Sequence, residues 1–145
     1  MQPLKKRFIA LLHVGYWGLY LLLLSVVFAI LRIQSPQKAS TITILLASPA
    51  GYISIAPNVV AFYLSYLLLF PRLLARRRIA ALLFGMIAGS IGSASVGLLT
   101  LSIISGVNQP AFANARELAS LIALLSGMAL IHMTIALVMR GSIHW

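Results

Sequence analysis

The chain has 145 residues, of which 61% are hydrophobic and only 8% charged; a water-soluble domain carries about a quarter charged residues, so a soluble globular protein is excluded. Eleven Lys and Arg residues face one acid, Glu117, and the absence of cysteine excludes disulfides, thiolate catalysis and cysteine metal sites. A formal net charge of +10 suggests nucleic acid, but that interpretation needs a soluble basic face, which this chain lacks. We expect an integral membrane protein that binds no nucleic acid.

Every charged residue lies between or outside four long charge-free stretches. These are Phe8–Leu31, Thr41–Phe70, Ile79–Ser105 and Leu118–Met139. Each exceeds the roughly 20 helical residues that cross a hydrocarbon core of about 30 Å. A Lys or Arg at a helix centre costs roughly 2.5–3.5 kcal/mol, so charges confined to the joints are not accidental. The sequence predicts an all-α, polytopic four-transmembrane-helix bundle, a single domain over 1–145 with helices at about 8–31, 50–70, 79–105 and 117–139.

The basic residues also predict the orientation. Eight of them fall on the side of the N-terminus (Lys5, Lys6, Arg7, Arg72, Arg76, Arg77, Arg78 and Arg140), and three on the other side (Arg32, Lys38 and Arg116). The positive-inside rule therefore places both termini in the cytoplasm, in a bacterial inner membrane. The apolar run after Arg7 is too long for a signal peptide, and no A-x-A-like site follows it, so we expect an uncleaved first helix.

The second stretch is too long for one straight crossing, since 30 residues would reach about 45 Å. Pro49 and Gly51 are expected to separate an outer turn, Thr41–Ala47, from the crossing. Pro57 lacks a backbone donor and is expected to kink this helix, with Ser54 or Asn58 satisfying the freed carbonyl. The alternative is that Pro57 simply lies in the first turns of the helix, where a proline is tolerated.

The third helix carries a small residue at every fourth position, and such residues let helices approach closely in lipid. The series is Ala81, Gly85, Gly89, Ser93 and Gly97, and the fourth helix offers Ala119, Ala123 and Gly127 as a counterpart. Positions i and i+4 share one face, so the series predicts a smooth groove. The groove receives either a helix of the same chain or a second copy of it.

The joint before the fourth helix has turn chemistry in Gly106, Asn108 and Pro110. Asn114 and Glu117 then have the spacing of a capping box, which satisfies open amides at a helix start. The only acid therefore has a structural role available, against the alternative of proton or cation binding.

Convergent titratable or nucleophilic groups are missing from the sequence. One Glu and no Asp or Cys leave no carboxylate pair, and no nucleotide or metalloprotease motif occurs, so we expect no catalytic, cofactor or metal residue and no enzyme activity on this chain alone. Two intramembrane histidines, His13 and His132, do not define a metal site. His132 and Asn58 are the polar intramembrane candidates, with structural hydrogen bonding as the alternative reading.

Aromatic residues gather at Tyr16, Trp17 and Tyr20 and again at Tyr63 and Tyr66, which indicates either interfacial anchoring or a contact between the first two helices. Together with other residues they carry a resemblance. Lys5-Lys6-Arg7 with His13, Tyr16, Trp17 and Tyr20, then Asn58, Tyr63, Tyr66, Pro71 and Arg72, resemble the membrane region of LytS/YehU-type sensor histidine kinases, notably the short four-helix versions of Bacteroidetes.

The resemblance implies a homodimer whose membrane helices feed a cytoplasmic phosphoacceptor domain and a GHKL-type ATPase. This sequence contains neither of those, and His144 does not fit the phosphoacceptor pattern. We therefore expect the membrane sensing or anchoring module of a two-component signalling system, acting as a homodimer or with a cytoplasmic kinase partner. The alternatives are a small transporter or channel, with Pro57, Asn58 and His132 along a path, and an accessory membrane subunit.

Overall fold

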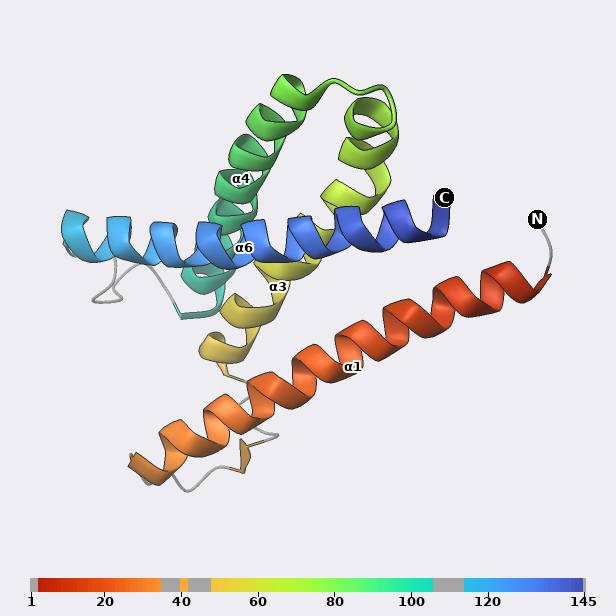
Figure 1. Ribbon diagram of the computed structural model, residues 1–145. Coiled ribbons are helices and arrows are strands. Elements are labelled where there is room, and N and C mark those ends of the chain that lie inside the picture. Colours follow the sequence, from red (N-terminus) through yellow and green to blue (C-terminus); the bar gives the residue numbers. More distant parts are fainter. Residues whose placement is uncertain (1–2, 35–39, 42–47, 106–113, 145) are drawn as a thin grey trace. The chain divides into compact units, whose positions relative to one another are not determined.

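The computed structural model describes residues 3–34, 40–41, 48–105 and 114–144. The described residues form long helices and no strand: α1 (Pro3–Gln34), α3 (Pro49–Leu64), the π-helix η1 (Ser65–Leu74) that continues α3, α4 (Ile79–Ser105) and α6 (Ala115–His144). Within these described ranges, four apolar segments are long enough to cross a membrane, at Arg7–Leu31, Pro49–Leu74, Ile79–Ile104 and Ala115–Ile143 (Figure 1). The all-α, multi-pass prediction is confirmed.

The helices extend past most of the predicted bounds. The first, second and fourth reach beyond 8–31, 50–70 and 117–139, and the third coincides with 79–105. The expected joint with Gly106, Asn108 and Pro110 lies outside the described residues, as does all of the turn Thr41–Ala47 except Thr41.

The chain divides into two compact units, Met1–Ser48 and Pro49–Trp145. The first unit contains α1, whose span is lined with exposed Leu, Val and Ile side chains, as expected of a helix that meets lipid. Tyr16, Trp17 and Tyr20 form an edge-to-face series along it, with ring centroids 5.1 Å and 5.7 Å apart. These contacts join neighbouring side chains of one helix surface.

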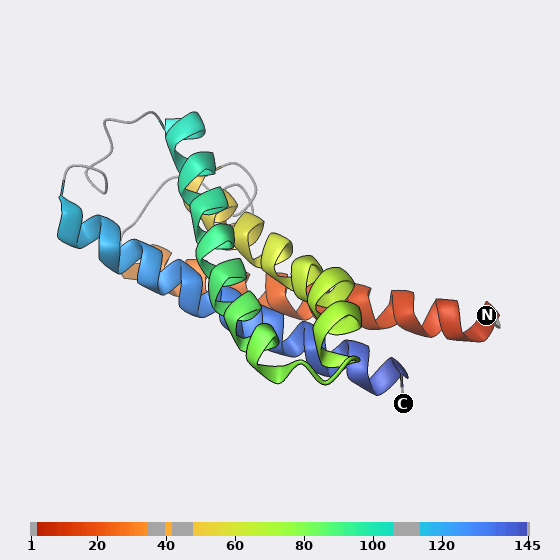
Figure 2. The same ribbon diagram turned by 90° about the horizontal axis from the view of Figure 1, so that it is seen from above.

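The second unit is built from α3 with η1, α4 and α6, all three in mutual contact. A Cβ added at Gly97 would meet both Pro57 and Leu125, whose numbers differ by 68; Ser65 bonds to Met133, again 68 residues away. This constant offset means that α3 and α6 run in the same direction. Along α4 the partners follow in reverse order, from Pro57 at Gly97 to Leu69 at Gly85, so α4 is antiparallel to both. Helix α6 crosses the other two obliquely (Figures 1 and 2).

Two apolar clusters join the described helices of this unit. Ala61, Ala129 and Met133 form one of them, with Leu64, Leu69 and Met86 packed against it. Phe70, Leu82 and Leu137 form the other, nearer the turn between η1 and α4. In the first cluster the small residues Ala61 and Ala129 meet the larger Met133, which lets the helix backbones approach closely; the second is built from large side chains alone.

The π-helix was not expected from the sequence, which predicted an ordinary α-helix to residue 70. Ala75 donates its backbone N–H to the Phe70 carbonyl at 2.9 Å, five residues back. Pro71 lies inside this segment and has no N–H to donate, and it clashes with the carbonyl four residues back in an α-helix. The wider π turn is the form in which this proline is accommodated.

Pro57 lies inside α3 and is buried. Asn58 donates its side-chain N–H to the Ser54 carbonyl at 2.7 Å, and Ser54 donates its hydroxyl to the Ala50 carbonyl at 2.8 Å. These two acceptors lie before and after the Ile53 carbonyl in the chain. In an α-helix the Ile53 carbonyl would accept the N–H of residue 57, which a proline lacks. Asn58 and Ser54 were expected to satisfy the carbonyl that Pro57 frees, but these two bonds go to the Ser54 and Ala50 carbonyls and not to that of Ile53.

The turn after η1 is a Schellman motif. Arg78 donates its N–H to the Leu73 carbonyl and Arg77 donates to the Leu74 carbonyl, both at 2.9 Å. These two bonds define the motif. The residue in the left-handed conformation just after the helix is normally glycine. Here it is Arg77, with φ of 57°, the one non-glycine residue of the described chain with positive φ.

We predict that Arg77→Gly stabilises the second unit. A side chain in the left-handed region costs about 1–2 kcal/mol, which glycine removes, so the free energy of unfolding in detergent rises by about 1 kcal/mol. Arg76→Gly is the matched control, because it removes the same charge without relieving strain and loses about 0.5–1 kcal/mol. Equal effects of the two substitutions would contradict the assignment.

A second prediction concerns the glycine face of α4. A Cβ at Gly97 would lie 2.5 Å from the Cγ of Pro57, a rigid ring, whereas at Gly89 the obstructing atoms are the movable ends of Leu64 and Met133. Gly97→Ala is therefore expected to cost about 1–3 kcal/mol, and Gly89→Ala less. Gly92, with nothing within 4 Å, is the control and should tolerate alanine. Chemical denaturation in detergent measures all three, and an unaffected Gly97→Ala protein would refute this order.

Candidate functional site

Among the described residues of the second unit, five polar side chains are buried. Their exposed fractions are 3% for Asn58, 0% for Ser65, 2% for Ser90, 1% for Ser93 and 3% for His132. They come from all three helices of the unit, and the two residues singled out from the sequence, Asn58 and His132, are among them. We call these five residues the polar core.

Most of the polar core bonds to the backbone of its own helix. Ser90 and Ser93 donate to the carbonyls of Ile87 and Gly89, each at 2.8 Å. Such bonds satisfy the serine hydroxyls within their own helix, where no water is present. These hydroxyls therefore need no partner from another helix.

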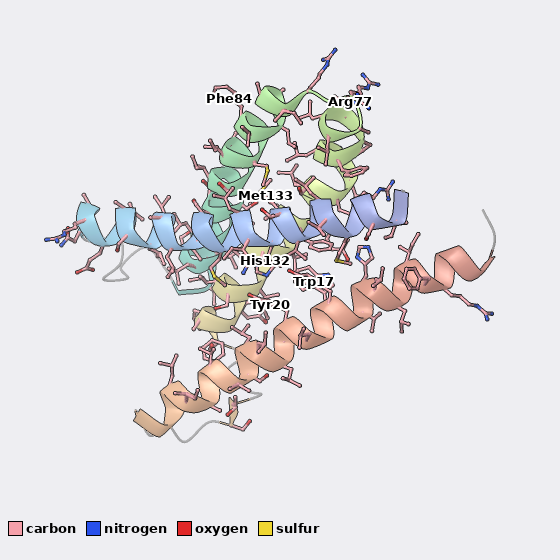
Figure 3. All side chains as sticks on the ribbon, in the orientation of Figure 1. Trp17, Tyr20, Arg77, Phe84, His132 and Met133 are labelled. Atoms are coloured by element: carbon pink, nitrogen blue, oxygen red, sulfur yellow. The ribbon has the colours of Figure 1, made fainter. Side chains whose placement is uncertain are left out.

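Ser65 makes a different kind of bond, since its hydroxyl donates to the Met133 carbonyl on α6 at 3.0 Å. The bond starts from the first residue of η1 and is completely buried. It joins the α-to-π transition of one helix to the middle of another. Met133 also projects toward α4, where its Cε would lie 2.9 Å from a Cβ at Gly89 (Figure 3).

His132 lies next to Met133 on α6, and its Nδ1 is 2.8 Å from the Met128 carbonyl. A carbonyl can only accept, so Nδ1 carries a proton and Nε2 is the acceptor nitrogen of the neutral ring. Pro57 lies opposite Gly97 of α4, and Asn58 is the next residue after it. Met133 lies opposite Gly89 of α4, and His132 is the residue before it. These levels differ by eight residues of α4, about 12 Å, so the two candidates do not form one compact site.

The residues that carry the family resemblance divide between the two units. His13, Tyr16, Trp17 and Tyr20 lie on α1; Asn58, Tyr63, Tyr66, Pro71 and Arg72 lie on α3 and η1. Within the second unit, Tyr66 is buried and stacks on Phe62 with ring centroids 6.0 Å apart and planes at 9°. The Arg140 guanidinium lies 4.8 Å from the centroid of the Tyr66 ring. Tyr66 is thus a contact point between η1 and the C-terminal part of α6.

The predicted helix-packing positions fall into two groups. Gly85, Gly89 and Gly97 face side chains from the neighbouring helices, and Ser93 is buried among them. Ala81, Ala123 and Gly127 are exposed in this chain, and nothing lies within 4 Å of a Cβ at Gly127. The groove of α4 therefore receives helices of the same chain, whereas the small residues predicted on α6 lie outside that contact.

The predicted helix start at Asn114 is partly of the expected form. Asn114 Oδ1 accepts the backbone N–H of Arg116 at 2.9 Å, and its carbonyl accepts the Leu118 N–H at 3.0 Å. The side chain thus caps the second helical amide rather than that of Glu117. Glu117 lies in the first turn of α6, where a carboxylate is favoured by the helix dipole.

Sequence reasoning missed Ser65 and the contact of Arg140 with Tyr66. Ser65 had a signal, because Asn58, Ala61 and Ser65 recur at i, i+3 and i+7 and so lie on one helix face. The pairing of Arg140 with Tyr66 had none, since it depends on the register between α6 and the π-helix.

Among the residues that the structure describes, no three His, Asp or Glu side chains gather in a way that could hold a metal ion. Comparison with protein-family models, with curated proteins and with solved structures found no match to this chain. The features that bear on function are therefore the buried polar groups and the contacts between helices.

We predict that Ser65→Ala weakens the contact between η1 and α6. Hydrogen bonds between membrane helices contribute about 0.6 kcal/mol on average and about 1.7 at most, so the free energy of unfolding should fall by about 1 kcal/mol. Ser95→Ala is the control, because Ser95 is exposed and donates only to Ile91 of its own helix. Unfolding in detergent, followed by helical circular dichroism, measures both. A loss as large for Ser95→Ala would contradict the prediction.

Proposed function

We propose that this chain is the membrane sensing or anchoring module of a sensor histidine kinase system of LytS/YehU type. In this proposal it lies in the bacterial inner membrane with both termini in the cytoplasm. It acts as a homodimer or with a cytoplasmic kinase partner, and phosphorylation is carried out by kinase domains outside these 145 residues.

The observation that carries the proposal is how α6 is held. This helix runs without interruption over Ala115–His144 and passes the glycine face of α4. Along this face α6 places the flexible side chain of Met133 opposite Gly89 and Leu125 opposite Gly97, and it accepts one hydrogen bond from Ser65 of η1. A long rigid helix resting on a smooth face can shift as a unit, and helix shifts of about 1–2 Å are an established way of passing a signal.

The contact at Tyr66 supports the same reading. Arg140 lies over the Tyr66 ring, and Tyr66 belongs to the segment that carries the family resemblance. Cation–π contacts are worth about 0.5–1 kcal/mol at exposed sites and more when desolvated. Such a contact is strong enough to favour one position of α6 and weak enough to be exchanged for another.

A small transporter or channel is the second candidate. It is favoured by the burial of Asn58 and His132, because polar and ionisable groups inside a membrane often mark a substrate path. It predicts substrate-dependent flux into proteoliposomes that His132→Leu abolishes. The sensor proposal predicts no such flux.

The sensor proposal is tested by joining the full chain, at its C-terminal end, to the cytoplasmic part of a LytS-type kinase. Autophosphorylation is then measured in membrane vesicles. Displacing α6 with Gly89→Leu should change the rate several-fold, because the added side chain meets Leu64 and Met133. Gly92→Leu is the matched control, since Gly92 has nothing within 4 Å of a Cβ and should leave the rate unchanged.

Two results would overturn the proposal. One is an autophosphorylation rate that Gly89→Leu and Gly92→Leu change equally, while both proteins remain in the membrane. The other is a pair of reporter fusions that place the two termini on opposite sides of the bilayer.

A further inference from the structure

Four arginines are concentrated at one end of the second unit. Arg72, in the last turn of η1, and Arg76, Arg77 and Arg78, in the turn that leads into α4, are all exposed. We call these four residues the arginine turn. Arg77 lies on the outside of the turn in Figure 3. Arg140 of α6 belongs to the same end, because it contacts Tyr66 of η1.

The chain supplies no acidic side chain to neutralise this charge. Its only acid, Glu117, lies in the first turn of α6. Arg140 is 23 residues further along that helix, which is about 35 Å. The arginine turn is therefore open to an anion from outside the chain.

The backbone conformation at Arg77 indicates that the side chain itself is used. A Schellman turn favours glycine at this position, and the left-handed conformation is costly for any other residue. The positive-inside rule accounts for basic residues in the turn, but any position in the turn would satisfy it. An observed backbone outlier of this kind points toward function.

Large apolar side chains continue directly from the arginines along α4. Ile79 is 54% exposed, Leu83 57% and Phe84 76%. The turn joins two candidate membrane spans, Pro49–Leu74 and Ile79–Ile104, so it lies at a membrane surface with these side chains on the lipid side of it. A cationic cluster above an apolar face matches a molecule with a phosphate head and acyl chains, which neither nucleic acid nor a soluble anion provides.

We propose that the arginine turn binds an anionic membrane phospholipid, with preference for the two phosphates of cardiolipin. Guanidinium groups bind phosphate oxygens in bidentate fashion, and four of them within seven residues exceed what one phosphate needs. Arg140 adds a fifth cation from α6. The bound lipid bridges η1, α4 and α6 at this membrane surface. This inference does not depend on the proposed sensor function.

The test uses the delipidated full chain in neutral detergent, with native mass spectrometry as the readout. The protein is titrated separately with cardiolipin, phosphatidylglycerol and phosphatidylcholine, and inorganic phosphate is added as a competitor at millimolar concentration. We expect cardiolipin to bind at least about 10-fold more tightly than phosphatidylcholine and more tightly than phosphatidylglycerol. Inorganic phosphate should not displace it.

The variant R76Q/R77Q/R78Q should bind cardiolipin at least about 10-fold more weakly. K5Q/K6Q/R7Q is the matched control, because it removes the same charge from the other basic cluster and should lose less than about 3-fold. Arg77→Gly separates binding from folding, since it should raise the melting temperature while it weakens cardiolipin binding.

Equal losses in the two triple variants would reduce the effect to general charge attraction and overturn the proposal. So would displacement by inorganic phosphate, which would make this a site for a free anion, or equal affinity for phosphatidylglycerol. A stabilised Arg77→Gly protein with unchanged cardiolipin affinity would also overturn the role given to Arg77.

Discussion

The close approach of two helices to one face of α4 is the constraint on which the second unit depends. In lipid there is no hydrophobic drive between apolar helices, so they associate through dispersion contacts at short range and a few hydrogen bonds. Gly85, Gly89 and Gly97 remove the Cβ atoms that would hold Leu69, Met133 and Pro57 away. The bond from Ser65 to Met133 shows that η1 and α6 approach each other equally closely.

The hydrogen bonds of the polar core also follow from the absence of water in the lipid. Ser90, Ser93 and Asn58 each donate to a carbonyl of the preceding turn, so no water is needed for these donors. Asn58 accompanies a proline that interrupts the backbone ladder of α3. Pro57 thus occurs where α4 approaches closely at Gly97 and shields the backbone, whereas Pro71 of the π-helix is exposed.

Much of the architecture could be predicted from the sequence, because charges are excluded from a hydrocarbon layer regardless of tertiary detail. The four spans and the glycine face of α4 follow from that rule and from a period of four residues. The π-helix could not be predicted, because Pro71 permits either a kink or a wider turn and the local sequence does not distinguish the two. Asn58 and His132 were identified as polar candidates, but their separation along α4 depends on a register that no single helix encodes. The exposure of Ala123 and Gly127 likewise depends on which face α6 turns inward.

The left-handed residue at the end of η1 has a consequence for evolutionary comparison. A lineage selected only for the geometry of this turn would drift toward glycine at position 77, since glycine adopts that conformation without cost. Retention of a basic residue at this position in orthologous chains would mark selection for its charge at the expense of backbone stability. The identity of residue 77 in orthologous chains therefore shows whether selection preserves the backbone conformation of the turn or an interaction of the side chain.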